Sequence, residues 1–168
     1  TPLNVPAPGG IPVKVWVELT GDANHVNDTL NTLVSGLAFL PTKRVVFEEA
    51  TGTWCGWCPR GAVYMDSLHN IHPNEAMLIA VHNSDPMVVT AYDAWIGTQI
   101  GGYPSGLADR KDIDIDPSQF ITAYNQRIND ISPCDVNVVA NFNPSNNSAW
   151  ITVTALFAGD ANGDYRIA

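Results

Sequence analysis

Two cysteines, Cys55 and Cys58, constrain the fold of this chain more than any other feature. They follow a short apolar run at residues 45–47 and precede Pro59, a residue that suits the first turn of a helix. Thiols at Cys-x-x-Cys spacing between a strand and a helix can cycle between a dithiol and a disulfide. The sequence therefore predicts a redox-active pair at a strand-to-helix junction.

The segment around the two cysteines alternates between candidate strands and candidate helices. Its apolar patterns predict strands at residues 44–50, 77–82 and 105–110, and helices at residues 59–69, 88–100 and 117–131. Such alternation is typical of α/β layer architecture with a central sheet. Residues 76–81 are continuously apolar, so we expect the second strand to be buried on both faces.

The two flanks of this segment have β patterns instead. Apolar residues alternate with polar ones over residues 13–19, and residues 136–142 and 150–156 predict a hairpin of two long strands. A further strand is predicted at residues 165–168. We therefore divide the chain into an N-terminal β segment (1–41), an α/β domain (42–131) and an incomplete C-terminal β segment (132–168). We expect the flanks to be accessory segments of β-sandwich type.

The composition argues against several classes of function. The 168 residues include 8 Lys and Arg against 17 Asp and Glu, so the net charge is -9. Such a chain is a poor partner for nucleic acid and for anionic lipid. No apolar run reaches the length of a membrane-spanning helix, so we expect no membrane span in this chain. With only 3 cysteines, a redox pair is a better explanation than a structural disulfide framework.

The position of each thiol predicts its role. Cys55 precedes the helix, where free N–H groups and the helix dipole favour a thiolate, so we expect it to be exposed and to act as the nucleophile. Cys58 is expected to resolve the mixed disulfide by attacking Cys55. Arg60 adds positive charge nearby and should lower the pKa of both thiols. No prosthetic cofactor is needed, because the disulfide itself is the redox-active group.

Residues 45–58 resemble the thioredoxin signature, with Trp54 just before the first cysteine and Gly56 just after it. The resemblance covers residues 42–131 and implies a thioredoxin-like central sheet with flanking helices. It also implies protein thiols or disulfides as substrates and a redox partner protein. Residues 47–61 together with the flanks resemble, more narrowly, a thioredoxin-like outer-membrane or secreted protein family of Bacteroidetes bacteria. Membership would imply export to the periplasm, the outer-membrane surface or the medium.

The same resemblance implies roles for further residues. Glu49, six residues before Cys55, stands where thioredoxins carry a buried carboxylate that assists proton transfer. Glu48 would take the inward place after a one-residue shift, so either acid is a candidate and Glu49 is preferred. Tyr103 and Pro104 resemble the loop in which that fold holds a cis proline against the dithiol, where the backbone meets an extended substrate.

Trp57 departs from the thioredoxin pattern, because a proline usually occupies this place between the two cysteines. A bulky aromatic side chain there would shape the surface on which a substrate docks. We therefore count Trp54 and Trp57 with Tyr103 and Pro104 as candidate substrate-binding residues.

Two metal interpretations are open but disfavoured. Cys55 and Cys58 with His69 and His72 could be written as a zinc site, but a helix from residue 59 would carry the histidines to its far end. Alternating oxygen ligands at residues 160–164 and at Asp112, Asp114 and Asp116 suit calcium, but a turn and a solvated face explain them better. We therefore assign no metal ligand.

Two hypotheses remain. The leading one is a thiol–disulfide oxidoreductase that works through Cys55 and Cys58. The alternative is a non-catalytic cell-surface or adhesion module in which the disulfide is structural and the β segments bind. Cys134 is expected to be a small buried hydrophobe, with a third redox role as the other option.

Overall fold

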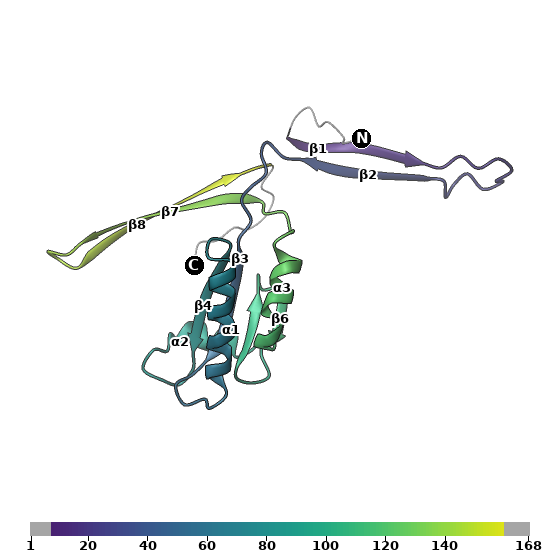
Figure 1. The fold of residues 1–168 in the computed structure, drawn as a ribbon. Coiled ribbons are helices and arrows are strands. Elements are labelled where there is room, and N and C mark those ends of the chain that lie inside the picture. The colour runs from purple at the N-terminus through teal and green to yellow at the C-terminus, as the bar shows by residue number, and fades with distance from the viewer. Residues whose placement is uncertain (1–7, 160–168) are drawn as a thin grey trace. The chain divides into compact units, whose positions relative to one another are not determined.

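The computed structural model describes residues 8–159 and divides the chain into two compact units. Lys43–Asp130 form the central unit, and the described flanks, residues 8–42 and 131–159, form the flanking unit (Figure 1). The strand predicted at residues 165–168 and the calcium loop weighed at residues 160–164 lie outside the described residues.

The central unit is built on one four-stranded sheet. Its strands are β3 (Val45–Thr51), β4 (Ala76–His82), β5 (Ser105–Ala108) and β6 (Asp112–Ile115), in the order β4-β3-β5-β6. β4 is parallel to β3, whereas β5 is antiparallel to both β3 and β6. Together with the helices, this sheet confirms the predicted mixed α/β class.

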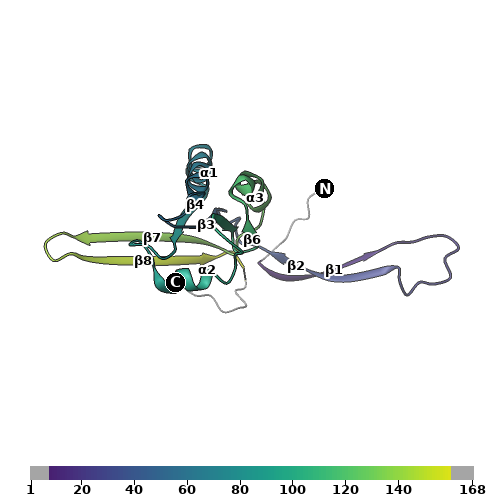
Figure 2. The ribbon, with the colours of Figure 1, turned by 90° about the horizontal axis from the view of Figure 1, so that it is seen from below.

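Three α-helices cover the sheet. α1 (Cys58–Ile71) and α3 (Phe120–Arg127) lie on one face, and α2 (Thr90–Ile96) lies on the other (Figure 2). α2 is shorter than the predicted 88–100, and Gly97, a poor helix former, is its C-cap. The helix predicted at residues 117–131 is split, because the 3-10 turn η1 (Pro117–Gln119) precedes α3.

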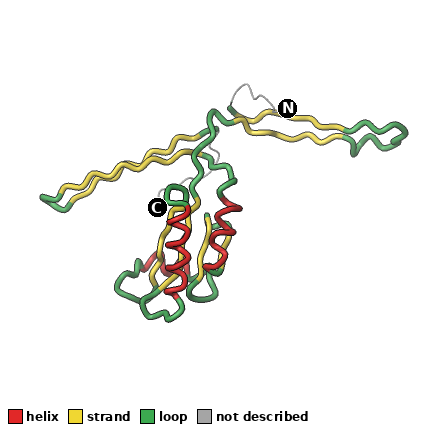
Figure 3. Tube along the Cα trace, viewed as in Figure 1, coloured by secondary structure: helices red, strands yellow, loops and turns green. Residues whose placement is uncertain are grey.

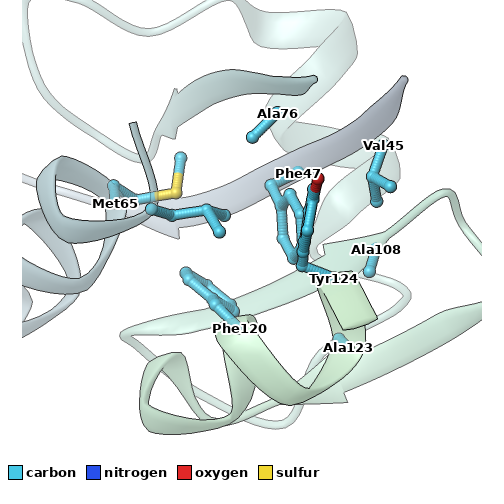
Figure 4. Close-up of a cluster of buried hydrophobic side chains, with 9 residues drawn as sticks. Val45, Phe47, Met65, Ala76, Ala108, Phe120, Ala123 and Tyr124 are labelled. Carbon is cyan, nitrogen blue, oxygen red and sulfur yellow. The ribbon is translucent and has the colours of Figure 1, made fainter. Parts of the chain in front are cut away.

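The main hydrophobic core lies between the sheet and the α1/α3 layer. Alternate residues of β3, Val45 and Phe47, point to this side and are fully buried. They meet Leu68 from α1 and Phe120 from α3, and the rings of Phe47 and Phe120 are 5.4 Å apart between centroids (Figure 4). Because side chains of a strand alternate between its two faces, Glu49 is the next residue on this face, and it is also buried.

The prediction that the second strand is buried on both faces was wrong. In β4, Met77 and Ile79 are 47% and 38% exposed. β4 is an edge strand, and the short helix α2 covers only one end of the face on which these residues lie. At that end Val81 packs with Ala50, Ile96 and Leu107 in a second buried cluster.

The flanking unit consists of two antiparallel hairpins (Figure 3). β1 (Gly9–Trp16) pairs with β2 (Thr29–Gly36), and β7 (Cys134–Asn143) pairs with β8 (Ser148–Phe157). The predicted C-terminal hairpin is confirmed, and the first strand starts and ends earlier than the predicted 13–19. Within residues 8–159 each hairpin is a separate two-stranded sheet, so the β-sandwich remains a prediction.

Candidate functional site

The two cysteines lie where β3 leads into α1. Cys55 and Cys58 form a disulfide with their Cα atoms 5.4 Å apart. The intervening turn is held by backbone hydrogen bonds, in which Cys55 N donates to Gly52 O and Cys58 N donates to Cys55 O. α1 begins at Cys58, one residue before the predicted start, and Pro59 falls in its first turn. The sequence thus placed the pair correctly at a strand-to-helix junction.

Cys55 is less accessible than predicted. It is 8% exposed and Cys58 is 4% exposed, so Cys55 is the more open of the two but both are buried. The disulfide ties Cys55 to the first residue of α1. The first turn of α1 contains no acidic residue, so no carboxylate within that turn opposes the helix dipole near the sulfurs.

Glu49 lies on the face of β3 that α1 covers. Its side chain is 3% exposed, and within residues 8–159 its Oε1 atom has no hydrogen-bond partner. Burial disfavours the charged form and, against a smaller opposing effect of His82, raises the pKa of Glu49 to about 7. A carboxyl group with such a pKa can accept or give up a proton near neutral pH.

Gly61 makes the space that the Glu49 carboxyl group occupies. A Cβ atom at Gly61 would lie 1.8 Å from Glu49 Oε1 and 3.3 Å from Pro104 Cβ. The site therefore brings together β3, α1 and the loop before β5 at one point. The sequence analysis missed Gly61. Its only local signal was a glycine in the first turn of a helix, where other residues have a higher helix propensity.

We expect Gly61→Ala to lower the free energy of unfolding by about 1–3 kcal/mol, because the new methyl group overpacks the Glu49 carboxyl group. In a Glu49→Ala background the same substitution should be neutral or stabilising by up to about 1 kcal/mol, because alanine favours the helix. Urea denaturation of the wild type, both single variants and the double variant measures this difference. An equal cost of Gly61→Ala in both backgrounds would show that the contact does not matter.

Glu48, the alternative acid, lies on the opposite face of β3. Its two oxygens accept hydrogen bonds from Arg110, at 2.9 Å from Nε to Oε2 and 2.6 Å from Nη2 to Oε1. The hydroxyl of Tyr92 also donates to Glu48, and the Arg110 guanidinium stacks 4.0 Å from the centre of the Trp95 ring. Glu48 is thus fully paired on the α2 side, and Glu49 is the acid on the α1 side.

Aromatic residues surround the approach to the disulfide. Trp54 donates a hydrogen bond from Nε1 to Asn83 O at 2.7 Å, and its ring meets the Tyr103 ring edge-on at 5.4 Å. The Tyr103–Pro104 peptide bond is cis, as predicted. Trp54 and Trp57 are exposed. The structure therefore brings together three of the four candidate substrate-binding residues, Trp54, Tyr103 and Pro104, and leaves Trp57 open to solvent next to Cys58.

Arg60 is paired with a neighbouring carboxylate. Its guanidinium forms an ion pair with Asp116 and lies 5.7 Å from the centre of the Tyr64 ring. The hydrogen bond from Arg60, followed by those from Ser118, lowers the pKa of Asp116. The Asp116 carboxylate thus balances the charge of Arg60, and the effect of Arg60 on the two thiols stays a prediction.

The acidic segment before η1 is largely a solvent-exposed face of an extended strand, as predicted, since Asp114 and Asp116 are exposed and Asp112 is half-buried, but its carboxylates are also paired. Asp112 pairs with Arg127 at 2.6 Å, and Asp114 accepts hydrogen bonds from Ser105 Oγ and Gly101 N. Asp116 pairs with Arg60 and caps η1 through Ser118 N. Each carboxylate thus fixes a neighbouring loop or helix.

The remaining candidates lie away from the disulfide or outside the central unit. His72 is the C-cap of α1 and stacks on Tyr124 with ring centres 3.7 Å apart, and His69 lies in the last turn of the helix. Cys134 is a half-buried free thiol at the start of β7, rather than the buried residue we had predicted. Within residues 8–159, no three His, Cys, Asp or Glu side chains form a group that could hold a metal.

The sequence analysis also missed His82 and Asp85, which follow one another closely at the end of β4. His82 Nδ1 lies 2.6 Å from Asp85 Oδ2. The Asp85 carboxylate further accepts hydrogen bonds from Thr53 N at 2.9 Å and Met87 N at 2.8 Å. Burial alone would raise the pKa of Asp85, but the hydrogen bonds from His82 and from the two backbone N–H groups outweigh it and lower the pKa to about 2. Asp85 thus links His82 to the loop that carries Cys55.

Comparison with known proteins gives distant structural likenesses. No protein-family model matches the chain. No curated protein matches it. HBP35 of Porphyromonas gingivalis has a solved structure that is 21% identical, with a TM-score of 0.44 over 60% of this chain. The chain spans only 38% of that HBP35 chain. A second structure, described as that of a malarial protein, is 13% identical with a TM-score of 0.38, over 51% of this chain and 98% of that one.

Of the helices formed by the described residues 8–159, none has the length and apolar character needed to cross a membrane.

Proposed function

We propose that the central unit is a thioredoxin-like thiol–disulfide oxidoreductase that acts on protein thiols or disulfides. The observation that carries this proposal is the Cys55–Cys58 disulfide at the start of α1, on the sheet face that also holds the buried carboxyl group of Glu49, whose Oε1 has no hydrogen-bond partner within residues 8–159. A dithiol beside a titratable buried acid has both groups that thiol exchange requires, a nucleophile and a proton acceptor.

The arrangement of the sheet supports the thioredoxin-like assignment. The strand order β4-β3-β5-β6, with one parallel and two antiparallel pairings, places the strand before the dithiol at the centre of the sheet. α1 and α3 share one face and α2 covers the other, as seen in Figure 2. The resemblance of residues 45–58 to the thioredoxin signature points to the same fold.

In the reducing direction, the Cys55 thiolate attacks one sulfur of a substrate disulfide. A mixed disulfide forms, and the other substrate sulfur leaves as a thiolate. Cys58 then loses its proton to the Glu49 carboxylate and attacks Cys55 Sγ. The Cys55–Cys58 disulfide forms again and the second substrate thiol leaves, so the substrate gains the two electrons that the dithiol loses. In the oxidising direction, a substrate thiolate attacks Cys55 and the same steps run in reverse.

Substrate would dock on the surface formed by Trp54, Trp57, Tyr103 and Pro104. Two of these rings, Trp54 and Tyr103, pack against each other, and the exposed Trp57 adds apolar area beside the disulfide. Apolar and aromatic surface of this kind suits an extended polypeptide segment around the substrate cysteine. A separate redox partner protein would restore the dithiol or disulfide after each turnover.

We further propose that the protein is exported to the periplasm, the outer-membrane surface or the medium. The narrower resemblance of residues 47–61 and of the flanks supports this location. An oxidising compartment would also keep the Cys55–Cys58 pair in the disulfide form seen here.

The decisive experiment measures the reactivity of Cys55 in the reduced protein, with Cys134 as an internal reference thiol. We expect iodoacetamide to modify Cys55 about tenfold faster than Cys134 at pH 7, with a midpoint of reactivity well below the value of about 8.5 for a free thiol. Peptide mapping by mass spectrometry gives both rates in one sample. If Cys55 reacts no faster than Cys134 or a free cysteine, the oxidoreductase proposal fails and the non-catalytic surface module becomes the better hypothesis.

A further inference from the structure

The pairing of β3 with β4 places His82 on the same face of the sheet as Glu49. In this parallel pair Glu49 lies opposite Ala80, and Thr51 lies opposite His82. Opposed residues of neighbouring strands point to the same side, as do residues two apart along one strand. His82 is therefore two residues beyond Ala80, on the face that α1 covers, and it is close enough for its charge to act on Glu49.

Asp85 fixes the orientation and tautomer of His82. A carboxylate oxygen can only accept a hydrogen bond, so the 2.6 Å contact requires that His82 Nδ1 carries a proton. Proton gain and loss therefore take place at Nε2. Asp85 also accepts hydrogen bonds from Thr53 N and Met87 N, so it cannot turn away from His82 without releasing the loop before Cys55.

The charged and titratable groups around His82 are otherwise acidic. Glu49 comes from β3 and Asp85 from the segment after β4. Among the residues that α1 buries, Cys58 is the titratable one. The carboxylate of Asp93 in α2 accepts hydrogen bonds from the side-chain amide of Asn83. Of these groups, His82 is the one that can carry a positive charge.

We propose that His82 is a positioning residue of the dithiol site: held by Asp85, His82 supplies the positive charge that allows the buried Glu49 to ionise. This inference rests on the oxidoreductase function proposed above. Glu49 must be a carboxylate to take the proton of Cys58, and burial opposes that charge. A protonated imidazole on the same sheet face offsets this cost without touching the substrate. Asp85 keeps the imidazole in place and ties it to the loop that presents Cys55.

The test measures the titration of Glu49 in the oxidised full chain, by NMR of its carboxyl carbon. We expect His82→Gln to move the midpoint of Glu49 upward from about 7 by about one pH unit. The matched control His69→Gln removes an exposed histidine from the last turn of α1 and should leave the midpoint unchanged. A midpoint that does not move in His82→Gln overturns the proposal.

One further variant keeps the proposal testable if His82→Gln does not fold. His82→Lys retains a positive charge and should keep the Glu49 midpoint at or below the wild-type value, whereas a rise as large as that expected for glutamine overturns the charge role.

These measurements separate the inference from the proposed function. They use the disulfide form and need no turnover, so they can fail while Cys55 remains reactive, or succeed while Cys55 is inert. In the active protein the expected consequence is a shifted pH profile. The rate of exchange that depends on the Glu49 carboxylate rises with pH through the Glu49 midpoint. This rise in the pH–rate profile should move to higher pH in His82→Gln and stay in place in His69→Gln.

Discussion

We expect Cys55→Ser to abolish thiol–disulfide exchange, and Cys58→Ser to stop it halfway, with the substrate held on Cys55. We expect the rate of Cys55→Ser to fall by at least about 10³-fold, the order of loss that follows removal of a nucleophile. In Cys58→Ser the first attack proceeds, but no second thiol is available to release the substrate. The mixed disulfide should therefore accumulate to nearly one equivalent.

A peptide with one disulfide serves as the substrate in this experiment. Intact-mass spectrometry under non-reducing conditions detects the adduct, and a peptide map places it on Cys55. Both variants are made in a Cys134→Ser background, because Cys134 is the free thiol that could form adducts of its own. An adduct on Cys58 in the Cys55→Ser variant, at the rate of wild-type exchange, would reverse the two roles.

Phe120→Ala is expected to have the largest effect on stability. Phe120 is fully buried, meets the Phe47 ring at 5.4 Å, and lies so close to Gly106 that a Cβ there would come within 2.6 Å of its ring. We expect the free energy of unfolding to fall by about 3–5 kcal/mol, from lost burial and a residual cavity.

Urea denaturation followed by tryptophan fluorescence measures this loss. Val63→Ala is the matched control, because Val63 is an exposed apolar residue of α1 and its truncation should change stability by no more than about 0.5 kcal/mol. A Phe120→Ala variant as stable as Val63→Ala would mean that the core between β3 and α3 does not hold the central unit together.

Local sequence patterns predicted the helices and strands of the central unit better than they predicted which residues of these elements are buried. Residues 45–58 show a strand and a helix start in the order of the chain, and the structure has both. The exposure of Met77 and Ile79 could not be predicted in this way, because it depends on the place of β4 at the sheet edge and on the short span of α2. Strand order and helix length are set by contacts between distant segments.

The same distinction between local patterns and distant contacts applies to the residues of the candidate site. Cys55, Cys58 and Glu49 follow from spacing and resemblance, because a fixed number of residues separates them along the chain. Gly61, His82 and Asp85 lack such a signal, since their importance comes from what they meet in space. The pairing of Arg60 with Asp116 was missed for this reason, and the positive charge predicted for the thiols is partly balanced.

The two adjacent glutamates of β3 make the site sensitive to the length of that strand. Side chains alternate between faces, so one residue inserted within β3 would exchange the positions of Glu48 and Glu49. Arg110 and Tyr92 lie on the α2 side, where they pair with Glu48 in the present register. A relative with such an insertion would keep an intact Cys-x-x-Cys motif but would place Glu48, and not Glu49, on the α1 side. An alignment of this chain with a candidate relative should therefore be judged by the spacing from Glu49 to Cys55, and not by the cysteines alone.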